Sequence, residues 1–470
     1  MSAKFPPFGR WPSVPGSPFS GFLCHSCSVI PLLSVREMRD CESRCVDRSI
    51  DALVRAAGTA VALEAQQLLG SCYGARVAVL VGPGLNGADG RVAGAWLKHR
   101  GARVDVIEVA SQPSTLRGFD LVIDAAFGIG CTRPYVAPLL GPGTLVLAVD
   151  VPSGVNADTG ELFGSPFKAD VTLAIGACKP AHVTGPAQAF VGELRYADID
   201  LVDEFRDGII EDSDLLSLGS SREDDHKWKH AMTIFAGSAL MTGAAELVAR
   251  GALAAGASMI RLQSHGDAVS SNSFPPEVVH VTGTEFDQRS RSVVAGPGLG
   301  GDVGAWLADR LENVRVPVVL DADALDRSVL DRLSSSMPRV MTPHAGEYER
   351  LTGHGVPSNR IGAVRQLSRD LDCVVLLKGP TTYVAEPSGS VRVVHSGTSA
   401  LATAGSGDVL AGMIGATIAR GHPPFVAAAL AAHLHGRAGA RLSTFAPASK
   451  IADQVTGLLD ELALERDLTN

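Results

Sequence analysis

Short apolar runs, each followed by glycine or polar residues, recur along most of this chain. Segments with apolar residues at helical spacing lie between many of them, the first at residues 35–69. This alternation predicts an α/β fold with largely parallel sheets, in which the carboxyl ends of the strands meet at one edge. The predicted strands are residues 76–81, 104–109, 120–124, 144–150, 170–175, 232–236, 292–295, 317–320, 339–342 and 372–377.

The distribution of these runs divides the chain into four parts. Residues 1–34 carry prolines, serines and glycines without periodicity, so we predict a disordered extension. Residues 35–205 and 227–470 each hold a full series of alternating runs and are predicted to be three-layer αβα domains, the first of them Rossmann-like. Residues 206–226 are rich in Asp, Glu and Ser, which predicts an exposed acidic linker.

A glycine-rich loop at residues 82–90 joins the first strand to a helix in the first half. Its G-x-G-x-x-G spacing in this context is typical of dinucleotide binding, so a nicotinamide-dependent oxidoreductase is one open interpretation and a tight packing turn is another. Asn86 and Asp89 lie among the glycines. These polar side chains suit a cation or a polarised substrate better than a bare pyrophosphate.

Polar residues also follow later strands of the first half. Asp124 ends one strand, and Asp150 and Ser153 follow the next. We expect them to meet Asn86 at one edge of the sheet, although each aspartate alone could equally cap a turn or helix. Oxygen ligands without cysteine or histidine would suit an alkali or alkaline-earth ion.

The second half contains a candidate phosphate-binding loop at residues 405–408. Small residues lead into an apolar segment of helical length, 409–419, which ends at Arg420 and Gly421. The free N–H groups of its first turn and the helix dipole form an anion site. Asp408 lies within this site, and we predict that its carboxylate handles a proton in phosphoryl transfer. The other strand ends predict a nucleotide and substrate cleft at the same edge.

Composition narrows the class of protein. The 470 residues carry a formal net charge of −9, which argues against binding to nucleic acid or to an anionic membrane. No apolar run approaches the ~20 residues that a membrane-spanning helix needs. Eight scattered cysteines do not form a secreted disulfide framework, so we expect free thiols and a cytoplasmic location.

Distinct motifs in the second half occur in the order of a known family between residues 227 and 459: GSALMTGAAELVARGALAAGA, GPGLG, LDADAL, MTPHAGEYERL, LLKGPTTYVAEPSG and SALATAGSGDVLAGMIGATIARG. This half resembles the ADP- or ATP-dependent NAD(P)H-hydrate dehydratase domain of the ribokinase-like superfamily. The first half is similar to the NAD(P)H-hydrate epimerase domain through VGPGLNGADG, DAAFGIGCTRP and VDVPSGVNADTG. The family loop usually reads Asn-Asn-Gly-Gly-Asp-Gly, so Leu85 and Ala88 depart from it, and Leu85 removes an amide that could bind substrate.

The resemblance implies a repair enzyme for NADHX and NADPHX, the hydrates of NADH and NADPH. The first domain would interconvert their R and S epimers with the help of potassium. The second would dehydrate the S form with ADP as co-substrate, releasing AMP and phosphate, with magnesium on the nucleotide phosphates. A homo-oligomer is expected. A ribokinase-like small-molecule kinase with a catalytically silent N-terminal binding domain is the alternative.

The resemblance also implies roles for particular residues. In the first domain the hydrate would contact Leu85, Asn86, Gly87, Ala88, Asp89, Gly128, Ile129, Gly130, Cys131, Thr132, Arg133, Pro134 and Asp150. Potassium would bind to Asn86, Asp124 and Ser153. In the second domain Asp408 would be the catalytic base, and the hydrate would contact Ala244, Gly298, His344 and Asp408. The nucleotide would contact Lys378, Gly379, Pro380, Thr381, Thr382, Gly405, Ser406 and Gly407.

Overall fold

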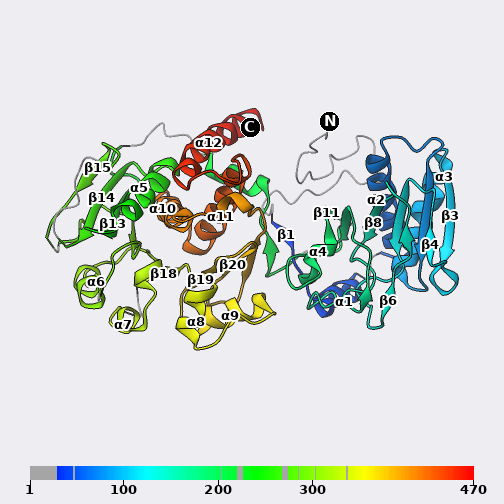
Figure 1. Ribbon diagram of the computed structural model, residues 1–470, viewed down its shortest axis with the longest axis horizontal. Helices are drawn as coiled ribbons and strands as arrows, with labels where there is room; N and C mark the ends of the chain where they lie inside the picture. The colour runs from blue at the N-terminus through cyan, green and yellow to red at the C-terminus, as the bar shows by residue number, and fades with distance from the viewer. Residues whose placement is uncertain are drawn as a thin grey trace. The chain divides into compact units, whose positions relative to one another are not determined.

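The computed structural model describes residues 29–45, 48–202, 204–219, 226–266, 274–283, 285–301, 303–334 and 337–469 (Figure 1). The chain divides into two compact units, unit 1 up to Ile209 and unit 2 from Ile210. Each unit contains a mainly parallel sheet with helices packed on it, so the predicted α/β class is confirmed.

Unit 1 is built around a parallel sheet. Strand β3 lies on one side of β2 and β5 on the other, which places a topological switch point between β2 and β5. The central strands consist of Val, Leu, Ile and Ala with almost no exposure, because both faces of the sheet are covered. In spatial order the strands are β11 (Glu193–Ala197), β10 (Val171–Ile175), β8 (Leu145–Val149), β5 (Leu121–Ala125), β2 (Arg76–Val81) and β3 (Arg103–Glu108).

Helices cover one face of this sheet, and α2 packs on α3. Gly58 of α2 allows the close approach, since a Cβ there would lie 2.5 Å from the Cβ of Val92. The other face carries a smaller apolar cluster around Leu116 and Phe167. The remaining elements are α1 (Val35–Arg44), α2 (Ile50–Leu69), α3 (Leu85–His99), α4 (Gln188–Val191), β1 (Ile30–Pro31), β4 (Thr115–Leu116), β6 (Tyr135–Val136), β7 (Leu139–Leu140), β9 (Gly164–Ser165), β12 (Gly208–Ile209), η1 (Val109–Ser111) and η2 (Pro180–His182).

The sheet of unit 2 is parallel except at β20 and β21, which form an antiparallel hairpin, with β20 also antiparallel to β19. Its switch point lies between β13 and β16. In spatial order its strands are β21 (Val391–Val394), β20 (Thr382–Ala385), β19 (Val374–Leu377), β18 (Arg339–Met341), β17 (Val318–Leu320), β16 (Ser292–Ala295), β13 (Ala231–Ser238), β14 (Met259–His265) and β15 (Val278–His280).

Two helical layers enclose this sheet (Figure 1). On one face lie α5 (Thr242–Ala254), α10 (Ser406–Ala419), α11 (Pro424–Ala440) and α12 (Ser449–Thr469). On the other face lie α6 (Gly304–Leu311), α7 (Arg327–Leu330), α8 (Ala345–Thr352) and α9 (Arg360–Asp370). Short 3-10 segments are η3 (Asp212–Leu218), η5 (Ala322–Ala324) and η6 (Ser399–Leu401). The predicted three-layer arrangement of this unit is confirmed.

Helix α10 lies against α5 at backbone distance. A Cβ on Gly412 would come within 2.0 Å of the Val248 carbonyl oxygen, and one on Gly251 within 2.3 Å of the Val409 carbonyl oxygen. We therefore expect Gly412→Ala to push the helices apart and to destabilise unit 2 by about 3 kcal/mol. Denaturant unfolding measures this change.

Gly457 offers a matched control, because it lies within α12 and a Cβ there would meet nothing within 4 Å. Gly457→Ala is expected to stabilise the same unit by roughly 0.5–1 kcal/mol through helix propensity. Equal effects of the two substitutions would contradict the close packing of α10 on α5.

Two predicted connecting segments differ from the structure over the residues that it describes. The part of residues 1–34 that the structure describes is ordered: β1 pairs with β12, and Leu33 is buried in the unit 1 core; residues 1–28 lie outside the described residues. Residues 206–226 are not an exposed linker over their described part, since Leu215 and Leu218 of η3 are buried. Both predictions rested on the average composition of these segments, which does not reveal the few apolar residues that become buried. The domain boundaries themselves stay a prediction.

Two helices differ from their expected bounds. Residues 35–69 form α1 and α2 rather than one helix, and the Ser49 hydroxyl caps the start of α2 by accepting from the Ala52 N–H at 3.2 Å. Helix α3 begins at Leu85, so residues expected in the glycine loop form its first turn. The free N–H groups at the start of α3 therefore lie at residues 85–87, next to the remaining part of the glycine loop.

None of the helices in the described residues combines the length and apolar character that a membrane crossing needs. Cys41, Cys45, Cys72, Cys131, Cys178 and Cys373 are free thiols. The expected homo-oligomer and cytoplasmic location stay predictions.

Candidate active sites in the two units

The predicted phosphate loop of unit 2 forms the N-terminus of α10. Gly405 is the N-cap with φ of 87°, in the left-handed region that favours glycine. A Cβ there would also lie 2.3 Å from Leu247 Cδ1, so glycine is required at this position on two grounds. The N–H groups of Gly407 and Asp408 in the first turn have no intrahelical partner, as an anion site requires, while the Ser406 N–H donates to the Thr403 carbonyl at 3.3 Å.

Asp408 is half-buried in the first turn of α10. Burial is the main cause that raises the pKa of its carboxyl to about 7, and the nearby Asp321, Asp323 and Glu347 carboxylates raise it further. The Lys378 ammonium acts in the opposite direction. A carboxyl that is partly ionised near neutral pH can accept a proton from a substrate hydroxyl and release it again.

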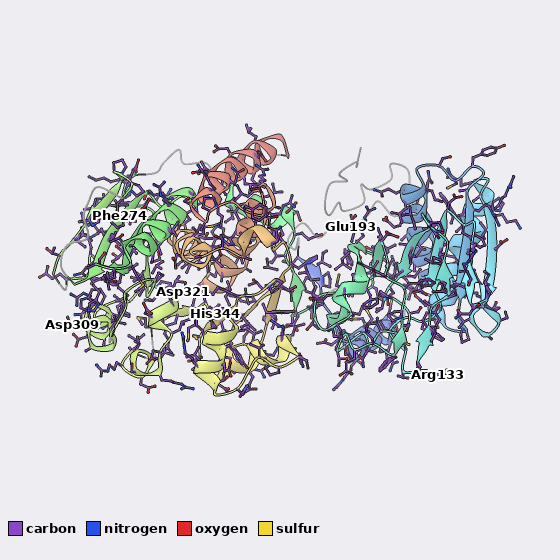
Figure 2. All side chains as sticks on the ribbon, viewed as in Figure 1. Arg133, Glu193, Phe274, Asp309, Asp321 and His344 are labelled. Atoms are coloured by element: carbon purple, nitrogen blue, oxygen red, sulfur yellow. The ribbon has the colours of Figure 1, made fainter. Side chains whose placement is uncertain are left out.

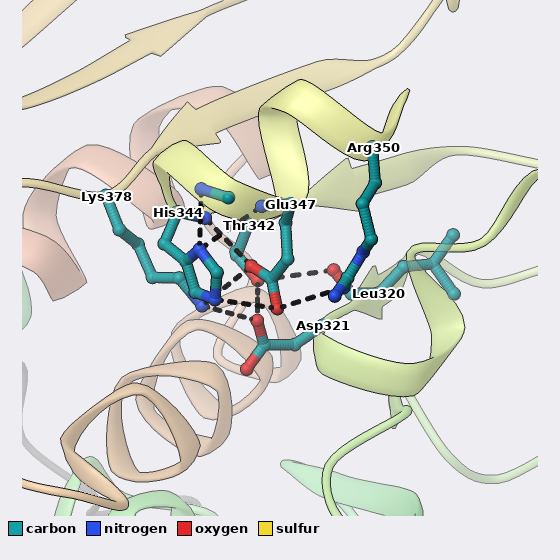
Figure 3. A network of polar contacts seen from close by, with 8 residues as sticks. Leu320, Asp321, Thr342, His344, Glu347, Arg350 and Lys378 are labelled. Atoms are coloured by element: carbon teal, nitrogen blue, oxygen red, sulfur yellow. Dashed lines mark hydrogen bonds and ion pairs between the residues drawn. The ribbon is translucent and has the colours of Figure 1, made fainter. Parts of the chain in front are cut away.

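Lys378, at the end of β19, connects the acidic residues of this site (Figure 3). Its Nζ lies 2.6 Å from Asp321 Oδ1 and 3.7 Å from Glu347 Oε2. Thr342 also donates to Asp321 Oδ1, at 2.8 Å. Burial favours the neutral amine, but Asp321 and Glu347 outweigh it and raise the pKa of Lys378. A Cβ on Gly407 would lie 3.4 Å from Nζ, so this cation also borders the α10 N-terminus.

His344 caps helix α8 and lies beside the same network. Its Nδ1 accepts from the N–H groups of Gly346 and Glu347 at 3.0 and 3.2 Å, which leaves the hydrogen on Nε2. The Glu347 carboxylate accepts from the His344 N–H at 2.8 Å, completing a capping box. Asp321 and His344 thus lie together in unit 2 (Figure 2). His344 caps the helix through Nδ1, so its Nε2 can still contact a substrate.

The structure brings other predicted residues of unit 2 together. A Cβ on Gly298, whose φ is 64°, would lie 2.6 Å from the Cβ of Ala244. Both therefore border the switch point between β13 and β16, where ligands bind in open α/β sheets. Residues Gly379, Pro380 and Thr381 form the turn that follows Lys378, and Thr382 begins β20.

Unit 1 contains a cavity of about 680 Å³ at its own switch point, lined by the ends of β2 and β5 and by α1 and α2. Among its lining residues are the predicted Leu85, Asn86, Asp89, Gly128, Ile129, Gly130, Cys131, Arg133 and Asp150. The predicted Gly87, Ala88, Thr132 and Pro134 do not belong to the lining. Leu85 is 53% exposed and lines the cavity, so an apolar side chain stands where the family usually has an amide.

Asp124, Ser153 and the 127–128 loop form a buried polar cluster beside this cavity. The Asp124 carboxylate accepts from the Ser153 hydroxyl at 2.6 Å and from its N–H at 2.9 Å. The Ser153 oxygen also accepts from the Phe127 N–H at 2.8 Å. Burial raises the pKa of Asp124, although the Ser153 bonds oppose it. Asn86 reaches this cluster, since a Cβ on Gly128 would lie 3.3 Å from its Cγ.

Three carboxyl groups surround the inner part of the cavity. Asp89 on α3 has its pKa raised to about 8, mainly by burial and then by Asp150 and Glu42. Burial also raises the pKa of Glu42 on α1. Asp150 follows β8 and forms an ion pair with the fully buried Lys179. The pair supplies one carboxylate with a fixed cation, while Asp89 holds its proton at neutral pH.

Comparison with known proteins assigns the family. The NAD(P)H-hydrate dehydratase family model matches residues 232–459, and a model described as YjeF-related protein N-terminus matches residues 50–117 and 109–181. The bifunctional NAD(P)H-hydrate repair enzyme Nnr of Mycobacterium leprae is 35% identical over 413 residues, which cover 79% of this chain and 84% of the relative. The chain belongs to the bifunctional NAD(P)H-hydrate repair enzymes.

Further comparisons agree with this family. The enzyme of the same name from Mycobacterium tuberculosis is 36% identical over 80% of this chain and 86% of the relative. A ribokinase-like superfamily protein from Enterococcus faecalis matches 56% of this chain and 98% of its own, with 21% identity and a TM-score of 0.50. That likeness confirms the ribokinase-like fold expected for the second half. The resemblance stated for both halves of the sequence is confirmed.

Sequence reasoning did not assign several residues that the structure places at the sites. Asp321 and Glu347 both contact Lys378 in unit 2. The available signal was that Asp321 directly follows β17 and that Glu347 lies in the first turn of α8, the helix after β18. Glu42 and Arg39 on α1 and the buried Lys179 were missed in unit 1. No local pattern distinguishes them from surface charges.

Proposed function

We propose that this chain repairs hydrated NAD(P)H: unit 1 interconverts the R and S epimers of NADHX and NADPHX, and unit 2 dehydrates the S epimer while ADP is cleaved to AMP and phosphate. The observation that carries the second reaction is the carboxyl of Asp408, which has a pKa of about 7 and lies at a free helix N-terminus beside Lys378. An anion-binding turn and a proton acceptor are the two parts that phosphoryl transfer to a hydroxyl needs.

The dehydration follows from the chemistry of the leaving group. Hydroxide leaves poorly at neutral pH and phosphate leaves well. Asp408 takes the proton of the C6 hydroxyl as its oxygen attacks the terminal phosphorus of ADP, and AMP departs. The N–H groups of Gly407 and Asp408 and the Lys378 ammonium stabilise the charge that develops on the phosphoryl oxygens. Loss of phosphate from C6 and of a proton from C5 restores the dihydronicotinamide ring.

Substrate positions follow from the same geometry. The nucleotide lies on Lys378, residues 379–382 and the α10 N-terminus. The hydrate lies between Asp408, His344 and the adjoining Ala244 and Gly298, two positions that carry no side chain larger than a methyl group. In unit 1 the hydrate occupies the cavity bordered by Asp150 and Arg133.

Magnesium would lie on the nucleotide phosphates and neutralise their charge. Among the described residues no group of three or more His, Cys, Asp or Glu side chains is arranged to hold a metal by itself. This fits an ion that takes one or two carboxylates and completes its coordination with substrate phosphates and water. Asp321, Asp323 and Glu347 are the carboxylates that would face it.

Recovery of absorbance near 340 nm tests the function of unit 2. The purified chain, incubated with the S hydrate, ADP and magnesium, is expected to restore NADH with one AMP and one phosphate per turnover. A kinase would instead leave a stable phosphorylated alcohol and no recovered absorbance, and that result would overturn the proposal. Repeating the assay with ATP decides which nucleotide is preferred.

Potassium is proposed as the ion of unit 1, where it would hold the substrate loop in place. The candidate ligands Asn86, Asp124 and Ser153 offer the oxygen donors that an alkali ion takes. Among the described residues the buried Nδ2 of Asn86 has no hydrogen-bond partner, so this amide keeps a donor for the substrate while its oxygen would bind the ion.

We therefore expect epimerisation to fall at least about tenfold when potassium is replaced by lithium at constant ionic strength. Ser153→Ala is expected to remove this dependence together with most of the activity. Chiral separation of the R and S hydrates over time measures both, and dehydration by unit 2 of the same chain serves as the control. Equal epimerisation rates in potassium and lithium would rule out the ion.

A further inference from the structure

Lys179 is fully buried in unit 1, where an unpaired ammonium would be very costly. All three of its hydrogen-bond donors are used. Nζ donates to Asp150 Oδ1, to the Ile175 carbonyl at 2.9 Å and to the Ala177 carbonyl at 2.8 Å. Because no donor remains for a ligand, this lysine can act on the cavity only through Asp150.

Asp150 itself is held in an unusual conformation. Its φ of 67° lies in the left-handed region, which a non-glycine residue adopts at a cost unless its surroundings enforce it. Its Oδ1 also accepts from the Ile175 N–H at 3.1 Å. Its carbonyl lies 2.7 Å from His182 Nε2, and His182 Nδ1 accepts from the Lys179 N–H at 3.1 Å, so Nε2 carries the hydrogen and donates. The segment after β10 thus fixes both ends of Asp150.

The remaining carboxylate oxygen, Oδ2, is the atom available to the cavity. Asp150 lines the cavity, and no hydrogen bond to Oδ2 occurs among the described residues. The other charged groups that line this region are Asp89 on α3, Glu42 and Arg39 on α1, and Arg133 after β5. Without Lys179, three carboxyl groups would share the cavity with Arg39 and Arg133 alone.

We propose that Lys179 is a positioning residue for epimerisation, which supplies the counter-charge of the Asp150 carboxylate and directs its free oxygen into the cavity. The proposal rests on the proposed function of unit 1. Two features separate it from ordinary core packing. A buried ammonium with three satisfied donors restricts Asp150 to one rotamer, and the pair leaves one oxygen of Asp150 exposed where the cavity begins. Removing the cation leaves the aspartate in place but neither fixed nor charge-balanced.

A double-mutant cycle on the full chain tests this role. Lys179→Met keeps the apolar stem and is expected to lower kcat for epimerisation about 100-fold, the scale of a misplaced reacting group, with a much smaller change in KM. In the Asp150→Asn background the same substitution is expected to change the residual rate by no more than about twofold, since its target is already lost. Equal losses in both backgrounds would show a merely structural role and overturn the proposal.

Two further variants separate charge from folding. Lys179→Arg keeps a cation and is expected to retain at least about ten times the rate of Lys179→Gln, which keeps polarity without charge. Equal rates for these two variants would overturn the proposal even if the methionine variant failed to fold. Dehydration by unit 2 reports the intact chain in every sample. If the wild-type chain does not equilibrate the R and S hydrates, the epimerase function itself is overturned. If the wild-type chain is active but the Lys179 and Asp150 substitutions have additive effects, only the positioning role of Lys179 is overturned.

Discussion

Asp408→Asn is expected to lower ADP-dependent dehydration by about 10³-fold or more while nucleotide affinity changes little. The asparagine keeps the shape and polarity of the side chain at the α10 N-terminus but cannot accept the hydroxyl proton. Steady-state recovery of absorbance near 340 nm measures the loss, and calorimetric titration with a non-hydrolysable ADP analogue measures binding. Near-normal turnover in this variant would exclude Asp408 as the base.

The same carboxyl predicts how rate and stability respond to pH. Its pKa is about 7 in the folded protein and near 3.8 in an unfolded chain. The ionised base therefore accumulates as pH rises, so the dehydration rate should increase to half its maximum near pH 7. Between these two values the folded state holds a proton that the unfolded state has released, so this group lowers the stability of the fold as pH rises through 7.

Asparagine cannot ionise, so the Asp408→Asn variant escapes this destabilisation. We expect it to be more stable than wild type by up to about 4 kcal/mol at pH 8 and nearly equal to it at pH 4. Denaturant unfolding at the two pH values measures the difference. A variant less stable than wild type at pH 8 would contradict the raised pKa of Asp408.

Lys378→Met is expected to destabilise unit 2 by about 3–5 kcal/mol at neutral pH, because it leaves the buried carboxylates of Asp321 and Glu347 without their shared cation. In the remaining folded protein the pKa of Asp408 should rise further above 7, since Lys378 opposes its elevation. The pH at half-maximal dehydration should therefore move upward.

Lys450 is the matched control in the same unit. Its ion pair with Asp453 is exposed, with side-chain exposures of 60% and 51%. Lys450→Met is expected to change stability by less than about 1 kcal/mol and to leave the pH–rate profile unchanged. If Lys378→Met were as mild as this control, the buried network would not hold the site together.

Much of the fold could be predicted because its signals are local. Apolar runs of strand length, glycines at turns and helical spacing each follow from neighbouring residues, and the rule that parallel strands end at one edge then places Asp124, Asp150 and Asp408 near the sites. The ordered residues 29–34 and 206–218 were missed, because their few apolar side chains become informative only against a partner elsewhere in the unit.

The sequence by itself determined which loops carry the chemistry: the residues 82–90 loop, the strand ends at Asp124 and Asp150, and the helix start at Gly405. Only the tertiary structure decided how those groups are charged and held. Lys378 lies between Asp321 and Glu347, and Lys179 lies buried against Asp150. Desolvation and Coulomb interactions depend on which distant segments exclude water and approach within a few ångströms, and no local pattern of residues contains that information.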